Sequence, residues 1–261
     1  MPPLLSIVIP AHNEEARLPV SLSKVFAFLE RQTYQAEVVI VENGSSDRTA
    51  QVVKAMVPDR PNLRLLREQA RGKGLAVRRG MLEATGAYRF ICDADLSMPI
   101  EERERFLPPQ LTGYDIAIGS REVSGARRFD EPPLRHLMGR VFNRLVSALV
   151  VSGYRDTQCG FKCFRGPVAE QLFALQRTPG FGFDAEILFL ARQRAHRVAE
   201  VPIDWYYRSE SKVKPLRDTF VMLGEMAHIR WNWARGAYDA LTAPPVADGQ
   251  VVGEEKTDAV T

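Results

Sequence analysis

The sequence predicts an α/β fold in which helices flank a mainly parallel sheet. The first observation is a regular alternation of apolar, β-rich runs with helical patterns across residues 1–120. The second is that these runs are almost continuously apolar, which is typical of strands buried on both faces. The third is the composition of the 261 residues, 45% hydrophobic and 26% charged, which fits one sizeable domain and excludes wholesale disorder.

The elements of residues 1–120 follow from these patterns. Strands are expected at 5–9, 38–41, 63–66, 88–92 and 116–118. The first helix is expected where Leu18, Leu22, Val25 and Phe26 recur at helical spacing, with Pro19 in its first turn, where a missing N–H costs little. Further helices are expected at 47–56, 74–84 and 101–111. Strand–helix–strand order implies right-handed crossovers and therefore parallel strands.

After residue 120 the alternation stops. An arginine-rich stretch at 121–133 precedes a predicted helix at 134–151, an extended segment at 161–164, a helix at 184–194, a strand at 198–203 and a last helix at 216–241. Residues 242–261 contain several prolines, glycines and acids and few large apolar side chains, which predicts a disordered tail. We therefore divide the chain into a main domain (1–215), an amphipathic helix (216–241) and a tail (242–261).

Polar side chains follow the predicted strands at the edge where parallel α/β sheets bind their ligands. Asp93 and Asp95 come directly after the fourth strand. Two carboxylates about 7 Å apart along a strand repel each other unless a cation offsets their charge. Mg²⁺ or Mn²⁺, completed by substrate phosphates, suits such a pair. The alternative is that Asp93 and Asp95 are two solvated loop acids without a ligand. The polar residues after the first two strands, Asn13, Glu14 and Glu42, could likewise serve only as helix caps or turn residues.

Several other classes of function are not expected. No Gly-x-Gly-x-x-Gly follows the first strand, so a dinucleotide cofactor is not predicted. The segment 72–74 is not a P-loop, although Lys73 could bring a cation near a phosphate. Three cysteines suggest a reducing compartment, and Cys159 and Cys163 lack the further ligands of a zinc site. A formal charge of +3 is too small to indicate nucleic-acid binding.

Taken together, these segments resemble a family 2 glycosyltransferase with the Rossmann-like GT-A fold. The matching segments are 6–15 (SIVIPAHNEE), 41–49 (VENGSSDRT), 72–74 (GKG), 93–97 (DADLS) and 119–121 (GSR). Two later segments, 156–162 (DTQCGFK) and 183–188 (FDAEIL), resemble the polyprenyl-phosphate glycosyltransferases, the branch that contains dolichyl-phosphate β-glucosyltransferases.

The resemblance implies a role for each matching residue. Asp156 and Asp95 are the implied catalytic residues, and Asp95 and Asp93 the implied metal ligands. The other implied roles are nucleotide-sugar binding by Pro10, Asn13, Glu14, Glu42, Lys73, Asp93 and Arg121, and binding of the acceptor phosphate by Arg208, Ser211 and Lys212. Many relatives have two Asp where this chain has Glu42 and Asn43, which leaves the choice of nucleotide open.

The implied reaction is an inverting, metal-dependent transfer of glucose, or a related hexose, from a nucleotide sugar to polyprenyl or dolichyl phosphate. UDP-glucose is the favoured donor, and GDP-mannose is the alternative. A soluble or glycolipid hydroxyl acceptor is also open, whereas the intact Asp93, Asp95 and Asp156 argue against a binding protein without turnover. A lipid phosphate is already largely ionised near pH 7. Asp156 is therefore expected to position the acceptor or to stabilise the developing charge at C1, rather than to accept a proton.

Two apolar stripes bear on membrane contact. One comprises Leu134, Leu137, Met138, Val141, Leu145 and Leu149, and the other comprises Leu216, Phe220, Leu223, Ala227, Trp231 and further residues of the last helix. Such stripes either pack on the core or lie on an anionic membrane surface. A spanning helix needs about 20 apolar residues, and none is expected. We therefore predict a cytoplasmic protein, peripheral at the cytoplasmic face of the membrane.

Overall fold

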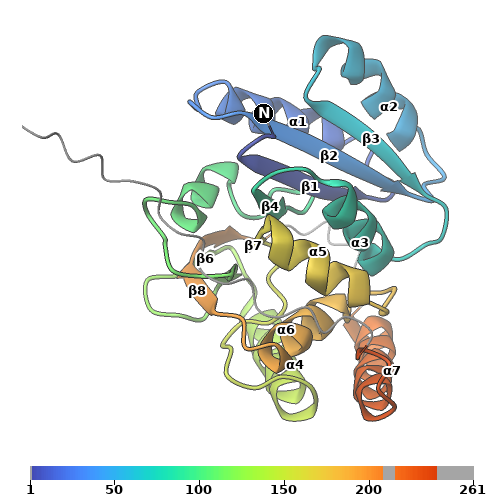
Figure 1. The fold of residues 1–261 in the computed structure, drawn as a ribbon, viewed down its shortest axis with the longest axis vertical. Helices are drawn as coiled ribbons and strands as arrows, with labels where there is room; N and C mark the ends of the chain where they lie inside the picture. Colours follow the sequence, from blue (N-terminus) through green and yellow to red (C-terminus); the bar gives the residue numbers. More distant parts are fainter. Residues whose placement is uncertain (1, 208–214, 240–261) are drawn as a thin grey trace, which may run out of the picture.

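The computed structural model describes residues 2–207 and 215–239, and within them a seven-stranded sheet forms the centre of the molecule (Figure 1). Its strands are, in chain order, β1 (Leu5–Ala11), β2 (Ala36–Asn43), β3 (Leu63–Glu68), β4 (Tyr88–Ile91), β5 (Ile116–Ser120), β7 (Lys162–Arg165) and β8 (Val198–Pro202). They lie in the order β3-β2-β1-β4-β7-β5-β8. Every pairing is parallel except those of β7, which runs antiparallel to both neighbours. The predicted, mainly parallel α/β sheet is confirmed.

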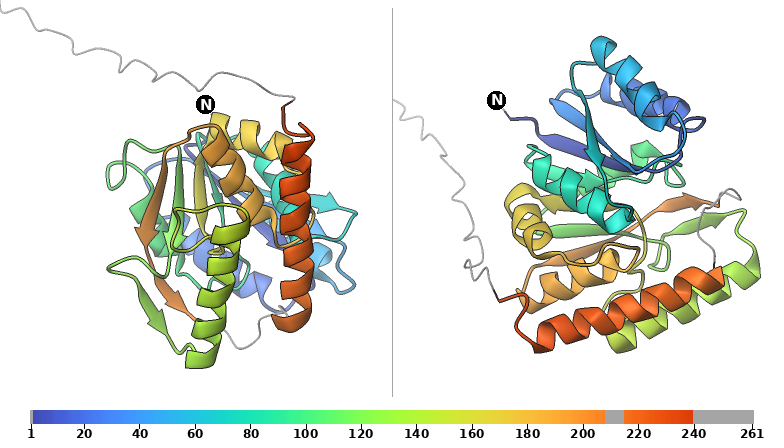
Figure 2. Two further views of the ribbon diagram at one scale, coloured as in Figure 1. Left: turned by 90° about the horizontal axis from the view of Figure 1, so that it is seen from below. Right: turned by 90° about the vertical axis from the view of Figure 1, so that its right-hand side faces the viewer.

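Helices cover both faces of this sheet (Figures 1 and 2). One face packs against α1 (Leu18–Leu29) and α2 (Thr49–Met56), and the other against α3 (Lys73–Glu83), α5 (Gly166–Leu175) and α6 (Phe183–Gln193). The remaining elements are η1 (Val57–Asp59), η2 (Ile100–Phe106), α4 (Pro133–Leu149), α7 (Pro215–Ala234) and a small parallel sheet of β6 (Arg127–Phe129) with β9 (Asp204–Tyr206).

The alternation of β1 explains the two layers. Successive side chains of a strand point to opposite faces of the sheet, and here Ile7 and Ile9 join the layer of α1 whereas Val8 joins the layer of α3. Gly80 lets α3 approach closely, because a Cβ at this position would lie 2.3 Å from Val8 Cγ1. Both faces of β1 are therefore covered by helices, and all of its residues except the half-buried Pro10 are buried, as its nearly continuous apolar sequence predicts.

The antiparallel strand β7 positions the functional edge of the sheet. Lys162, its first residue, pairs with Ile91 near the end of β4 and with Ile118 in β5. Because β7 runs antiparallel to β4 and β5, it begins at the edge of the sheet where they end. Residues 156–161, which precede β7, therefore lie at the same edge as residues 93–95 and 119–121. Three segments that are distant in sequence thus converge at this edge.

Two predicted elements differ from the structure, and one helix was not predicted. The helix expected at 101–111 is the shorter 3-10 segment η2, since Pro108 and Pro109 lack the N–H donors that a longer helix needs. The last helix ends at Ala234 rather than at residue 241. The helix α5 was not expected, although Pro167 lies in its first turn and Val168, Leu172 and Leu175 recur at helical spacing. The predicted tail at 242–261 lies outside the described residues.

The apolar stripe of α4 does not pack on the core. All of α4 is described, and only Val146 is buried in it, whereas Leu134 is 69% exposed and Leu137, Val141 and Leu145 are also exposed. Helical spacing identifies an apolar face, but it does not say what covers that face. Core packing is therefore wrong for the stripe of α4, although Val146 and Phe142 on another side of the helix do pack on the core.

Helix α7 lies beside α4, at the end of the molecule opposite α1 and α2 (Figure 2). Its core contacts come from Met222, Met226 and Ile229, which are buried. The predicted stripe is instead largely outward, with Phe220 72% and Trp231 64% exposed. Helices α4 and α7 together therefore present apolar side chains on the surface of the described molecule.

Candidate active site

A cavity of about 1170 Å³ lies at the carboxyl ends of β4 and β5, next to α4 and α7. Among the residues that line it are five of the predicted site residues: Lys73, Asp93, Asp95, Arg121 and Asp156. We call the side formed by Asp93, Asp95 and Asp184 the acidic wall of the cavity. We call the side formed by Leu134, Leu137, Val141, Leu145 and Phe220 the apolar wall. One space is thus acidic where the sheet ends and apolar where α4 and α7 lie.

The acidic wall begins directly after β4. Asp93 Oδ1 lies 2.6 Å from Lys73 Nζ, at the start of α3. The N–H of Ser97 donates to Asp95 Oδ1 at 2.9 Å, which closes a tight turn after the strand. Burial alone would lower the pKa of Lys73, but the charges of Asp93 and then Asp184 outweigh it and raise that pKa. Lys73 is therefore held as a cation beside Asp93.

The acidic wall fits a divalent metal that is completed by a ligand. Carboxylate oxygens are the donors that Mg²⁺ and Mn²⁺ prefer. Within residues 2–207 and 215–239, no group of three or more His, Cys, Asp or Glu side chains could hold a metal by itself. A cation at Asp93 and Asp95 would therefore take further oxygens from water or from a bound phosphate, which is how Mg²⁺ is usually held in phosphate sites.

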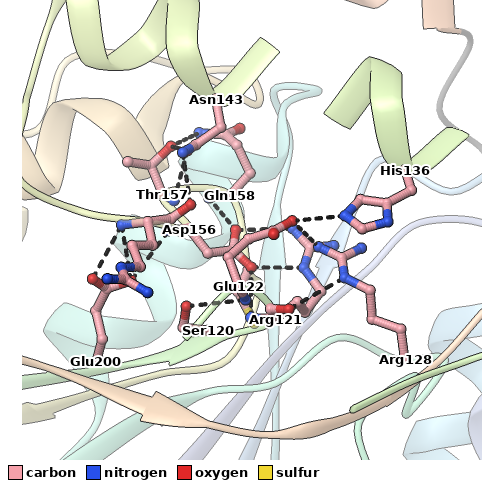
Figure 3. Close-up of polar contacts among 12 residues, drawn as sticks. Ser120, Arg121, Glu122, Arg128, His136, Asn143, Asp156, Thr157, Gln158 and Glu200 are labelled. Atoms are coloured by element: carbon pink, nitrogen blue, oxygen red, sulfur yellow. Dashed lines mark hydrogen bonds and ion pairs between the residues drawn. The ribbon is translucent and has the colours of Figure 1, made fainter. Parts of the chain in front are cut away.

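Asp156 faces the cavity as half of a buried ion pair (Figure 3). Arg121 Nε donates to Asp156 Oδ2 at 2.7 Å and Arg121 Nη2 donates to Oδ1 at 2.9 Å, a bidentate pair. Burial acts to raise the pKa of Asp156, but the charge and hydrogen bonds of Arg121 outweigh it and lower this pKa to about 2. The carboxylate is therefore ionised near neutral pH, and a weak proton acceptor.

Four further predicted residues lie at the ends of β1 and β2. Of the described residues that line the cavity, none is Pro10, Asn13, Glu14 or Glu42. Asn13 has a positive φ of 54° and its Oδ1 accepts the N–H of Ser46 at 2.8 Å. The N–H of Glu14 donates to Thr49 Oγ1 at 2.7 Å. These hydrogen bonds fix the two turns that follow the strands, while Pro10 lies in β1 opposite Val41.

Glu42 is an ionised carboxylate almost fully enclosed by the protein. Its side chain accepts the N–H of Ser45 at 2.5 Å and the Nε–H of Arg67 at 3.2 Å. Burial acts to raise the pKa of Glu42, but the hydrogen bonds of Ser45 and Arg67 hold this pKa below its usual range. Arg208, Ser211 and Lys212 lie outside the described residues.

The comparisons with known proteins agree with this geometry. Residues 6–173 match the profile of Glycosyl transferase family 2. The chain belongs to this family. The matching region contains β1 to β5, β7 and most of α5, and with them Asp93, Asp95, Arg121 and Asp156. The chain is therefore a glycosyltransferase.

Curated relatives of this glycosyltransferase extend the match. The dolichyl-phosphate beta-glucosyltransferase of Trichomonas vaginalis is 36% identical over 221 residues, which cover 80% of this chain and 66% of the relative. The dolichyl-phosphate beta-glucosyltransferase of Dictyostelium discoideum is 33% identical over 252 residues, which cover 90% of this chain and 76% of the relative. The chain thus spans 66% and 76% of the length of these two relatives.

Solved structures show the fold of this glycosyltransferase. The glucosyl-3-phosphoglycerate synthase of Mycobacterium tuberculosis in complex with UDP has a TM-score of 0.63 at 19% identity, covering 87% of this chain and 80% of that chain. The same synthase with Mn²⁺, UDP and glucosyl-3-phosphoglycerate has a TM-score of 0.63 at 18% identity, covering 88% and 79%. The fold is therefore GT-A, as predicted.

Some residues that shape the site of this glycosyltransferase could not be found from its motifs. Asn43 Nδ2 donates to the carbonyl of Ala70 at 2.5 Å, and Asn43 Oδ1 accepts the N–H of Gly72 at 2.8 Å. An ionised Asp at this position could accept but not donate. Asn43, which stands where many relatives have Asp, therefore links the end of β2 to the segment that carries Lys73 through a donated and an accepted hydrogen bond.

The loop that carries Asp156 is held from two sides (Figure 3). Glu200 accepts the N–H groups of Arg155 and Asp156 at 3.0 and 3.1 Å. Asn143 of α4 accepts the N–H of Thr157 at 3.0 Å and donates to the carbonyl of Arg155 at 2.7 Å. Asn143 lies on the side of α4 opposite the apolar stripe, so the stripe gives no sign of its role.

Proposed function

We propose that this glycosyltransferase transfers glucose from UDP-glucose to a polyprenyl phosphate such as dolichyl phosphate, with inversion at C1. The observation that carries the proposal is that one cavity combines the acidic wall with the apolar wall, joined by Arg121 and Asp156. An acidic wall suits a metal-bound diphosphate, and an apolar wall suits an isoprenoid chain. The names of the curated relatives support the same acceptor and sugar.

The donor is assigned to the acidic wall and to the residues at the ends of β1 and β2. Asp95 and Asp93 would hold Mg²⁺ or Mn²⁺ together with the diphosphate, and Lys73 would lie beside its oxygens. A bound cation would offset the negative charge that the leaving diphosphate gains. Pro10, Asn13, Glu14 and Glu42 would contact the nucleoside at the neighbouring strand ends.

Asp156 acts in this proposal as a fixed negative charge and not as a base. A lipid phosphate is largely ionised near pH 7, so its attack on C1 requires little proton transfer. The bond from C1 to the diphosphate breaks as the bond from C1 to the acceptor oxygen forms on the opposite face. The buried carboxylate, with its pKa lowered to about 2 by Arg121 against the effect of burial, would stabilise positive charge that develops at C1.

Arginines near the apolar wall would receive the acceptor phosphate. Arg121 and Arg128 lie over the ring of Trp205, at 5.3 and 5.9 Å from its centroid, and Arg135 lies 5.2 Å from that of Tyr207. Planar guanidinium groups held in this way suit a phosphate. We assign the same role to Arg208, Ser211 and Lys212, which lie outside the described residues.

Contact with a membrane forms part of the proposal, since a polyprenyl phosphate resides in a bilayer. Leu134, Phe220 and Trp231 are exposed on α4 and α7, and Arg140 and Arg144 are exposed on α4. Apolar and aromatic side chains mixed with arginine suit the surface of an anionic membrane. In the described ranges, no helix has the length and apolar character needed to span a bilayer. We propose peripheral binding at the cytoplasmic face through α4 and α7.

A transfer assay tests the proposal. The purified chain is incubated with Mg²⁺, a short polyprenyl phosphate in detergent, and radiolabelled UDP-glucose or GDP-mannose. We expect label in the organic phase from UDP-glucose, dependence on the phosphate group when polyprenol is substituted, and loss of product in Asp95→Asn. Label from GDP-mannose alone would overturn the proposed donor. Metal-dependent nucleotide release without a lipid product would overturn the proposed acceptor in favour of a soluble or glycolipid hydroxyl.

A further inference from the structure

Helix α7 contacts the segment 179–182 through the carboxylate of Glu225. Glu225 Oε2 accepts the N–H of Gly182 at 2.8 Å, and the N–H of Gly180 donates to the same side chain. The carboxylate fills the space beside both glycines, since a Cβ at Gly180 would lie 2.1 Å from Glu225 Oε1. Glu225 therefore holds the segment 179–182 by its backbone.

This segment packs directly on the start of α3. The N–H of Leu75 donates to the carbonyl of Pro179 at 3.3 Å. A Cβ at Gly72 would lie 2.2 Å from that same carbonyl oxygen, and a Cβ at Gly74 would lie 2.4 Å from the carbonyl oxygen of Thr178. Because these neighbours are backbone atoms, they cannot swing away. The segment 179–182 and the first turn of α3 therefore cannot shift independently of each other.

The same segment faces the cavity through Phe181. Both Phe181 and Lys73 line the cavity, and Lys73 Nζ lies 6.0 Å from the centroid of the Phe181 ring. Lys73 also pairs with Asp93. A continuous set of contacts thus runs from Glu225 on α7, through residues 179–182, to Lys73 at the acidic wall.

A second carboxylate secures the other end of this loop. Glu186 of α6 accepts the N–H groups of Arg177 and Thr178 at 3.0 and 2.8 Å. Its Oε1 also accepts the hydroxyl of Tyr238 at 2.6 Å, just beyond α7. With Glu186 in place, removal of Glu225 would free residues 179–182 without detaching the whole loop.

We propose that Glu225 is a positioning residue for the nucleotide sugar: it fixes residues 179–182 so that Lys73 and Phe181 keep their places beside the diphosphate. This inference rests on the proposed function, because it takes Lys73 to lie beside the diphosphate. It adds that α7, which also carries the exposed Phe220 and Trp231, determines how well the donor binds. Since Glu225 does not reach the reacting atoms, its effect is on donor binding and not on the chemical step.

The test compares Glu225→Ala and Glu225→Gln with Glu104→Gln, an exposed acid of η2 that serves as the matched control. UDP binding is measured by calorimetry with Mg²⁺, and KM and kcat are measured for UDP-glucose. For Glu225→Ala we expect the Kd for UDP and the KM for UDP-glucose to rise about tenfold, with kcat changed by less than about threefold. Glu225→Gln, which retains one acceptor, should show a smaller rise in both, and the control should match the wild type.

The outcomes separate this inference from the proposed function. If the wild type itself fails to bind UDP, the proposed function fails and the inference fails with it. If the wild type binds UDP and Glu225→Ala binds it equally well, or if only kcat falls, the positioning role is wrong while the proposed function stands. Should Glu225→Ala not fold, Gly180→Ala replaces it, because its Cβ would displace the same carboxylate.

A double-mutant cycle tests the route of the effect. If Glu225 acts through Lys73, then adding Glu225→Ala to Lys73→Ala should weaken UDP binding by less than about threefold beyond the single Lys73 variant. Additive losses would contradict this route.

Discussion

Two groups of helices place their apolar residues in opposite ways. In α1, Leu22 and Val25 are buried against the sheet. In α4 and α7, which lie beside the cavity, residues at the same helical spacing, such as Leu134 and Phe220, are exposed. An apolar stripe therefore indicates a neighbour of low polarity. For α1 this neighbour is the sheet, whereas the exposed residues of α4 and α7 are not covered by another part of the described chain.

The largest expected effect lies on the acidic side. Replacing Asp95 by Asn keeps the shape of the side chain but removes one of the two charges assigned to the metal. We expect transfer from UDP-glucose to fall by about 10³-fold, and chelation by EDTA to abolish it in the wild type. Initial rates with Mg²⁺ and Mn²⁺ measure this. Full activity of Asp95→Asn, or of the wild type in EDTA, would contradict a metal at this wall.

The next largest effect is expected at Asp156, which lies between the acidic and the apolar wall of the cavity. Because Asp156→Asn removes the fixed negative charge, we expect transfer to fall about 100-fold. Arg121 lowers the pKa of this carboxylate to about 2 despite its burial, so it stays ionised over about pH 5 to 8 and the loss should be equal across this range. Rates of both proteins across the range measure this. A loss confined to low pH would indicate instead that Asp156 accepts a proton.

The same pKa has a consequence for stability. A carboxylate whose pKa is lowered on folding stabilises the protein above its ordinary pKa, and this contribution is lost as the pH falls toward the lowered value. The difference in free energy of unfolding between the wild type and Asp156→Asn should therefore shrink as the pH falls from about 4 to about 2. Urea unfolding at several pH values measures it.

Two adjacent residues of α4, one buried and one exposed, should contribute very differently to the free energy of unfolding. Val146 is buried and Leu145 is 40% exposed. Val146→Ala should lower the free energy of unfolding by about 2 kcal/mol, whereas Leu145→Ala should change it by less than about 0.5 kcal/mol. Chemical denaturation of the two variants decides the matter. Equal losses would mean that the stripe of α4 is covered by protein after all.

The smallest expected effect concerns the exposed apolar stripe of α4, part of which forms the apolar wall of the cavity. Leu137→Asp combined with Val141→Asp should reduce binding to vesicles that contain anionic phospholipid by about tenfold, because two apolar side chains of the stripe are replaced by negatively charged ones. Val20→Asp is the matched control, since Val20 is 59% exposed on α1, at the opposite end of the molecule. Vesicle flotation measures the bound fraction. Equal losses in both proteins, or no loss in either, would contradict membrane binding through α4.

Two of the three residues of the acidic wall could be predicted from sequence because their signal is local, whereas Asp184 is brought to the wall by α6. Asp93 and Asp95 follow an apolar strand directly, so the rule for ligand sites in parallel sheets locates them without any knowledge of the tertiary structure. Arg121 after β5 is located in the same way. Lys73 is brought to Asp93 by the first turn of α3, a pairing that the sequence alone does not reveal.

The rest of the site depends on contacts between distant segments. Asp156 reaches the same sheet edge only because β7 is antiparallel, and no pattern in residues 162–165 indicates its direction. Asn43 and Asn143 act through hydrogen bonds to backbone atoms of other segments, and such partners leave no periodic trace. Glu225 lies on the polar side of a predicted amphipathic helix, where an acid would be expected to face solvent.

The central claim is that the two sides of the cavity serve one reaction. It is tested most directly by isolating the lipid product formed from UDP-glucose and a short polyprenyl phosphate with Mg²⁺, and determining its mass and anomeric configuration by mass spectrometry and NMR. We predict a polyprenyl phosphate that carries one glucose in β linkage, inverted from the α linkage of the donor. An α-linked product, or consumption of UDP-glucose with no glucosylated lipid, would contradict it.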